Sequence, residues 1–229
     1  MGVREFARSS VGGKTVMAVS GIGLCGFILI HMLGNWLVFA GPNVLNNYAA
    51  NLKANSLLLW GARTGLLFCF GVHIFVGIRL AAANRVARPI PYGYPSTIQA
   101  NAASRTMIHT GLLVLAFLFF HLAHFTFHFF NSADVIEDAK YRVDVFRMVV
   151  LGFQNPLIAS SYIVAMLLLG AHLSHGFSSL FQSLGLSHGR CQKSFRLMAI
   201  GFSLLITIGN ISMPIAVLTG VIHLQAGGR

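Results

Sequence analysis

Charged residues are rare along this chain, and the intervals between them predict its main elements. Five stretches, 15–52, 64–78, 106–133, 148–189 and 197–228, contain no Asp, Glu, Lys or Arg. A helix needs about 20 apolar residues to cross a bilayer. Each stretch can hold one such helix if the second helix begins before Arg63. The pattern therefore predicts membrane-spanning helices at about 14–40, 55–83, 105–131, 155–184 and 195–225.

Proline and glycine refine the expected helix boundaries. Pro156 suits the first turn of the fourth helix, and Gly185 suits its stop. Pro214 lies inside the fifth predicted helix and indicates a kink there. We expect an all-α integral membrane protein, with residues 1–229 forming a single membrane domain and the first four helices forming a bundle.

The composition supports this fold class. Of the 229 residues, 55% are hydrophobic and 9% are charged, and the mean hydropathy is +0.73. Soluble domains are about a quarter charged. The three cysteines, Cys25, Cys69 and Cys191, form no CxxC or CxxCH motif, so covalent c-type haem attachment and a cysteine-bound iron–sulfur cluster are not expected.

The distribution of basic residues predicts the orientation in the membrane. Ten of the sixteen Lys and Arg residues lie in the N-terminal segment, in 79–105 and in 190–196; they are Arg4, Arg8, Lys14, Arg79, Arg85, Arg88, Arg105, Arg190, Lys193 and Arg196. The positive-inside rule places these segments in the cytoplasm and the C-terminus outside. The net charge of +11 then reflects topology and contacts with lipid or subunits, and no nucleic-acid partner is expected.

Four histidines lie at matched depth in four of the predicted helices. His31 is 17 residues past Lys14, His73 is 17 past Ser56, His121 is 16 past Arg105 and His172 is 16 past Pro156. At about 1.5 Å per residue, all four lie about 24–26 Å along their helices. Because successive helices run in opposite directions, His31 and His121 are expected toward the outer face, and His73 and His172 toward the inner face.

Two pairs of histidines at two depths suit two bis-histidine haems. Haem iron takes two axial ligands because the porphyrin fills its other positions, whereas a zinc site needs more protein ligands at one depth. A glycine follows three of the histidines by three or four residues; these are Gly34, Gly77 and Gly176. A missing side chain there is expected to let a flat ring approach.

Other histidines leave alternatives open. His121, His124 and His128 share one helical face, and depth favours His121 with His124 as the alternative. His172 has the alternative His175. The spare histidines are expected to form interhelical hydrogen bonds, or to contact haem propionates or a quinone.

Four blocks of sequence resemble one family. They are "SSVGGKTVMAVSGIGLCGFILIHMLGNWLVFAGP", "ARTGLLFCFGVHIFVGIRLAAANRVARP", "TGLLVLAFLFFHLAHF" and "AHLSHGFSSLFQSLGL". In order and with a histidine in each, they resemble the single-chain dihaem cytochrome b subunit of succinate dehydrogenases and fumarate reductases. The resemblance implies two haem b groups, held by His73 and His172 on the inner side and by His31 and His121 on the outer side.

The same resemblance implies partners and a role. A flavoprotein subunit interconverts succinate and fumarate, an iron–sulfur subunit relays electrons, and the membrane subunit anchors both in the cytoplasmic membrane and exchanges electrons with a quinone, which the resemblance suggests is menaquinone. This chain has no Rossmann glycine motif and no cysteine cluster, so no catalytic residue is expected in it. A dihaem subunit of a hydrogenase or formate dehydrogenase is the nearest alternative, and a haem-free transporter with a histidine relay is a more distant one.

The chain departs from the family pattern at the positions that carry protons. Some dihaem fumarate reductases have a glutamate two residues before the fourth ligand, where this chain has Gly170. A glutamate used for menaquinol in some members has no counterpart in 42–55. Arg63, about 15 Å from His73 along the helix, is a candidate partner for a propionate of the outer haem, with snorkelling to the headgroups as the alternative.

Overall fold

The computed structural model describes residues 9–87, 102–130, 132–189 and 191–224, together with Gly2 and Glu5. Within them the fold is all-helical, apart from one isolated bridge between Glu137 and Val143. Five helices are long and apolar enough to cross a membrane; they are α2 (Ser10–Asn35, continued by the 3₁₀ helix η1, Trp36–Ala40), α4 (Ser56–Val86), α6 (Met107–Phe125), α8 (Pro156–Ser183) and α9 (Gln192–Leu218). The predicted set of five spanning helices is confirmed.

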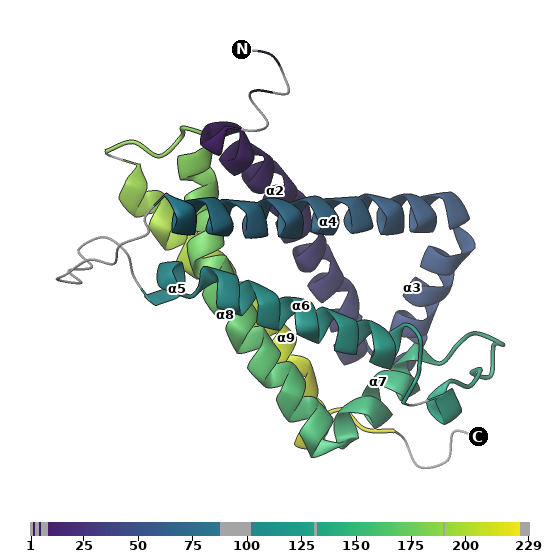
Figure 1. The fold of residues 1–229 in the computed structure, drawn as a ribbon. Coiled ribbons are helices and arrows are strands. Elements are labelled where there is room, and N and C mark those ends of the chain that lie inside the picture. Colours follow the sequence, from purple (N-terminus) through teal and green to yellow (C-terminus); the bar gives the residue numbers. More distant parts are fainter. Residues whose placement is uncertain are drawn as a thin grey trace.

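Shorter helices occupy the connections. They are α3 (Pro42–Ala54), α5 (Ala102–Arg105), η2 (Ser132–Asp134) and α7 (Val145–Gln154). Figure 1 shows α3 and α7 at the end of the molecule where the C-terminus lies, opposite the end that carries the N-terminus. The sequence analysis did not expect α3 or α7.

Side-chain caps explain where four of the helices begin. Ser9, Asn55, Asp144 and Asn155 each accept a hydrogen bond at 3.0 Å from a backbone N–H two or three residues further on. These bonds satisfy donors that the first helical turn leaves without a partner. Pro156 occupies the first position of α8, as predicted.

Two predicted helix ends were wrong. The third spanning helix ends at Phe125 and not near 131, because the backbone turns back: Phe127 N–H donates to Leu122 O at 2.8 Å and His128 adopts φ 55°. The fifth ends at Leu218 and not near 225, because Gly220 adopts φ 75° and Ile222 N–H bonds back to Ala216 O, which turns the backbone away from the helix axis. Gly185 has φ 73° just after α8, so the stop predicted there is confirmed.

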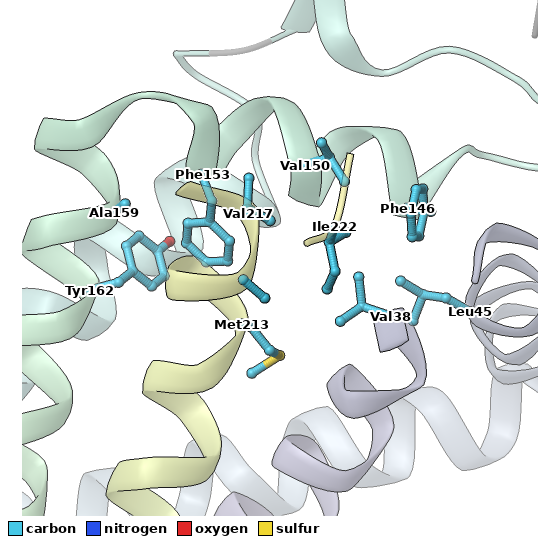
Figure 2. Packing of buried hydrophobic residues seen from close by; sticks show 11 residues of the cluster. Val38, Leu45, Phe146, Val150, Phe153, Ala159, Tyr162, Met213, Val217 and Ile222 are labelled. Carbon is cyan, nitrogen blue, oxygen red and sulfur yellow. The ribbon is translucent and has the colours of Figure 1, made fainter. Parts of the chain in front are cut away.

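Helix α8 is the centre of the packing. It lies against α2, α6, α7 and α9, whereas α4 packs mainly on α2 and has few contacts with α6. One buried cluster joins α2, α8 and α9 through Met32, Leu169, Leu173 and Ile206. A larger cluster fills the end near α3 and α7, with residues such as Val38, Leu45, Val150 and Met213 pointing toward one another in Figure 2.

Candidate functional site

The four histidines at matched depth lie in two facing pairs. In the pair expected toward the outer face, called the outer pair below, His31 of α2 and His121 of α6 have ring centroids 5.8 Å apart and an interplanar angle of 88°. In the pair expected toward the inner face, called the inner pair, His73 of α4 and His172 of α8 have centroids 6.5 Å apart at 67°. These are the two pairs expected from depth. His31 is exposed and the other three histidines are half-buried.

The centroid separations of both pairs are close to that of two imidazoles bound to one metal ion. With a metal–nitrogen distance of about 2.0 Å and a ring centroid about 1.1 Å behind the nitrogen, two opposed imidazoles have centroids about 6.2 Å apart. The two observed separations lie on either side of this value. Within the described ranges, no group of three or more His, Cys, Asp or Glu side chains is placed to hold a metal ion. Two ligands on one axis are what haem iron takes.

Hydroxyl groups lie beside Nδ1 of both inner histidines. Ser20 Oγ lies 3.2 Å from His73 Nδ1, and it also lies 2.9 Å from Val16 O and 3.1 Å from Met17 O. When the Ser20 hydroxyl donates to one of these carbonyl oxygens, its own oxygen can accept from the Nδ1–H of His73. The Nε2 lone pair of His73 is then available to a metal ion.

The same arrangement recurs at His172. Thr110 Oγ1 lies 3.3 Å from His172 Nδ1 and 3.1 Å from the carbonyl oxygens of Thr106 and Met107. A Thr110 hydroxyl that donates to one of these carbonyls can accept from Nδ1–H of His172, which leaves Nε2 of His172 free. In this arrangement both inner histidines present Nε2 as the acceptor, which is the form a metal ligand needs.

The two halves of the site are a repeat that the sequence analysis missed. Helices α2 and α6 each carry Met-x-x-(Ser/Thr)-Gly followed by nine residues and a histidine: "MAVSGIGLCGFILIH" from Met17 and "MIHTGLLVLAFLFFH" from Met107. In each half, the glycine of the motif lies against the inner histidine of the next spanning helix. A Cβ on Gly21 would be 3.7 Å from His73 Cε1, and one on Gly111 would be 3.2 Å from His172 Cε1.

The glycines that follow the histidines lie against protein side chains. A Cβ on Gly77 would meet Met17 Cε at 3.2 Å, and one on Gly176 would meet Met107 Cε at 3.8 Å. A Cβ on Gly34 would meet Tyr48. The contact of each motif methionine with a glycine extends the repeat.

The structure separates the ligand candidates from their neighbours. His124 is 1% exposed and its Nδ1 lies 3.0 Å from the hydroxyl of Tyr162, while its ring is not paired with His31. His175 is half-buried and makes no ring contact with His73 in the part of the chain that the structure describes. His121 and His172 are the residues that face a second histidine.

Two further positions from the sequence analysis have defined surroundings. Arg63 is exposed, and its guanidinium lies 5.1 Å from the centroid of the Trp60 ring. Gly170 faces α9: Ser203 Oγ donates to its carbonyl at 2.7 Å, and a Cβ there would collide with Thr207 Oγ1. Any larger side chain at this position would require Thr207 to move.

Comparisons of the chain with protein-family models, with curated proteins and with solved structures found no match. A functional assignment therefore depends on the paired histidines and on the resemblance of the four sequence blocks.

Proposed function

We propose that this chain is the membrane anchor and electron-transfer subunit of a succinate:quinone oxidoreductase. His31 and His121 would hold one b-type haem, and His73 and His172 a second. When bound, the two haems supply one-electron carriers between an iron–sulfur partner and a membrane quinone such as menaquinone.

The chain itself holds, orients and shields these groups. Each pair comes from two different spanning helices, and sites on helices are held more rigidly than sites on loops. Ser20 and Thr110 lie beside Nδ1 of His73 and His172, and they would accept from Nδ1–H when Nε2 binds the metal. The surrounding helices are apolar, so they exclude water and provide the low dielectric in which buried charge is costly.

The partners follow from the same proposal. Flavin and substrate chemistry belongs to a flavoprotein subunit, which docks with the iron–sulfur subunit on the cytoplasmic side. Basic residues at the end of the molecule that carries the N-terminus supply the docking surface; they include Arg79, Arg85, Arg105, Lys193 and Arg196. The orientation in the cytoplasmic membrane, with the N-terminus inside, follows the positive-inside rule.

The observation that carries the proposal is the repetition of one facing histidine pair at each of two levels, with matching hydroxyl partners at the inner level. A histidine that serves only as an interhelical hydrogen bonder needs one polar partner on another helix. It does not need a second imidazole facing it at this centroid distance, and still less at two separate levels.

Haem stoichiometry tests the proposal. We would purify the chain in mild detergent from haem-sufficient cells, record a reduced-minus-oxidised spectrum and quantify haem per polypeptide. The expected result is two b-type haems per chain, one in His121→Ala, and two in the matched control His124→Ala. A colourless wild-type protein would contradict the proposal and favour the transporter. Loss of haem from the His124 variant alone would reassign the ligand.

The co-purifying subunits test the choice of dehydrogenase. Gentle purification from native membranes is expected to recover a flavoprotein with succinate dehydrogenase or fumarate reductase activity and an iron–sulfur subunit. Recovery of a hydrogenase or a formate dehydrogenase in their place would keep the dihaem subunit and overturn its assignment to succinate.

A further inference from the structure

Tyr162 of α8 lies between two histidines of α6. Its hydroxyl oxygen is 3.0 Å from His124 Nδ1 and 3.4 Å from His121 Nδ1. Its ring meets both imidazoles edge-on, with centroids 5.9 Å from His121 and 5.8 Å from His124. Tyr162 is 7% exposed, and Figure 2 shows its ring beside Phe153 at one side of the buried cluster. No part of the proposed function so far uses this contact.

A single hydroxyl hydrogen limits how the three side chains can be connected. Tyr162 can donate to one histidine and must accept from the other. If Nε2 of His121 binds a metal ion, its Nδ1 carries hydrogen and donates to the Tyr162 oxygen. Tyr162 then donates to Nδ1 of His124, and His124 carries its hydrogen on Nε2. Metal ligation at His121 thus selects one of the two possible directions of the hydrogen bonds that connect His121, Tyr162 and His124.

Neighbouring groups hold His124, the last member of this hydrogen-bonded series, in a fixed position. His124 is packed against Phe125, with ring centroids 4.0 Å apart. On its other side is the backbone of α7, where a Cβ on Gly152 would lie 3.1 Å from His124 Cε1. Only glycine leaves this much room. Nε2 of His124 is buried and has no hydrogen-bond partner within the described residues, so the hydrogen bond that His124 makes there is the one with Tyr162.

We propose that Tyr162 is a positioning residue for His121, held in turn by His124, and that this pair tunes the outer haem independently of the inner one. The inference rests on the proposed function. A hydrogen bond from the distal nitrogen of a metal-bound imidazole raises its basicity and fixes its rotation. At the inner level that acceptor is a hydroxyl bonded to its own helix backbone, at Ser20 and at Thr110. At the outer level it is Tyr162, whose own partner is a third side chain.

The test is a redox titration of the purified two-haem protein, with the two haems resolved by their spectra and by low-temperature electron paramagnetic resonance. Tyr162→Phe removes only the hydroxyl, so a less basic His121 should raise the potential of the outer haem and leave the inner one unchanged. Thr110→Val is the matched control, because it removes the acceptor of His172 and should shift the inner haem alone.

A second variant keeps the test decisive if Tyr162→Phe fails to retain the outer haem. His124→Leu leaves Tyr162 in place but removes the acceptor of its hydroxyl, and it should shift the outer haem in the same direction by a smaller amount. Two haems with an unshifted outer potential in these variants, or an equal shift of both haems, would overturn the inference and leave the proposed function intact. Absence of haem from the wild type would instead overturn the proposed function itself.

Discussion

At the inner level, single hydroxyl groups lie beside one ring nitrogen of each histidine. Ser20 and Thr110 each lie in a helix that faces a histidine of another helix, and each hydroxyl is within hydrogen-bond distance of its own backbone carbonyls. Serine and threonine in membrane helices commonly bond their own backbone, and a hydroxyl that does so can accept from the Nδ1–H of the imidazole.

The histidines of α8 offer a test at the scale of single residues. We expect His172→Ala to lose the inner haem and to keep the outer one, because His172 faces His73 at 6.5 Å. The matched variant His175→Ala should retain both haems, because His175 makes no such pair in the described residues. Haem content per polypeptide measures both. Equal loss in the two variants would show that α8 responds to any change near the inner pair.

Depth along the helix was enough to select the four paired histidines, but not the hydroxyl groups that lie beside them. Which side chain faces His73 across a helix interface depends on the rotation of α2, and hydropathy does not determine that rotation. The repeated Met-x-x-(Ser/Thr)-Gly spacing from Met17 and Met107 was the available signal for Ser20 and Thr110. Tyr162 carried no signal, because one aromatic residue in an apolar helix is ordinary.

At the scale of elements, long apolar stretches located the five spanning helices, while the shorter helices were missed. Helix α7 lies partly within an uncharged stretch that was attributed to the fourth span alone. Its apolar face packs against segments distant in sequence, α3 and α9, as well as against α8, and hydropathy does not reveal the distant contacts. The end of α6 at Phe125 was missed for a similar reason, since "TFHFF" after Phe125 remains apolar although the backbone turns.

The close packing of α8 on α9 gives a prediction for these elements. Gly170→Ala places a Cβ against Thr207 Oγ1 and is expected to destabilise the fold by about 1–3 kcal/mol, as overpacking does. Thr207→Ala in the same chain removes the colliding oxygen and should restore most of that loss. Reversible unfolding in mixed micelles measures the free energies.

Gly201→Ala provides the control for this pair of variants. Gly201 also lies in α9, and nothing lies within 4 Å of the position that its Cβ would take. Alanine there should leave stability unchanged or raise it by up to about 1 kcal/mol through helix propensity. If Thr207→Ala does not rescue Gly170→Ala, the contact between α8 and α9 is not the source of the loss.

The hydrogen bonds of Asn46 with Phe146, Asp144 and Asp138, here called the polar clasp, connect α3 with α7 and give a pH-dependent prediction. Asn46 accepts from Phe146 N–H at 3.0 Å and donates to Asp144 at 3.0 Å and to Asp138 at 3.3 Å. Hydrogen bonds from the Arg142 side chain are the main cause that holds the pKa of Asp138 well below its usual range. Because the folded pKa is lowered, the clasp is at full strength above the ordinary carboxyl pKa of about 3.9 and is lost as pH falls below it.

Hydrogen exchange, corrected for the intrinsic pH dependence of amide rates, measures this loss. Protection of the backbone amides of α3 should fall as pH drops below about 4, while protection of α8 stays unchanged. Asp138→Asn should show the reduced protection already at neutral pH, because the ion pair with Arg142 is gone. Protection of α3 that is equally high in this variant would show that Asp138 does not stabilise the clasp.

At the scale of the whole molecule, the charges and the fold make one joint prediction about orientation. With five spanning helices, α2 begins and α9 ends at opposite ends of the molecule (Figure 1), and the described basic residues Arg79, Arg85, Arg105, Lys193 and Arg196 lie in helices toward the end at which α2 begins. We expect a reporter that is active only outside the cytoplasm to be active when fused after Arg229 and inactive when fused after Leu186. The fusion after Leu186 lies just past α8, at the end of the molecule expected to face the cytoplasm.

Charge substitutions can then test which basic segments determine the orientation. Replacing Lys193 and Arg196 by glutamine should leave the orientation unchanged, because the N-terminal segment and 79–105 retain their basic residues and the bias acts through the sum of the short loops. Replacing basic residues in all three segments should produce a mixed population, visible as activity from both fusions. A mixed population in the unaltered chain would mean that these charges serve another purpose, and docking of the cytoplasmic partner would be the first to test.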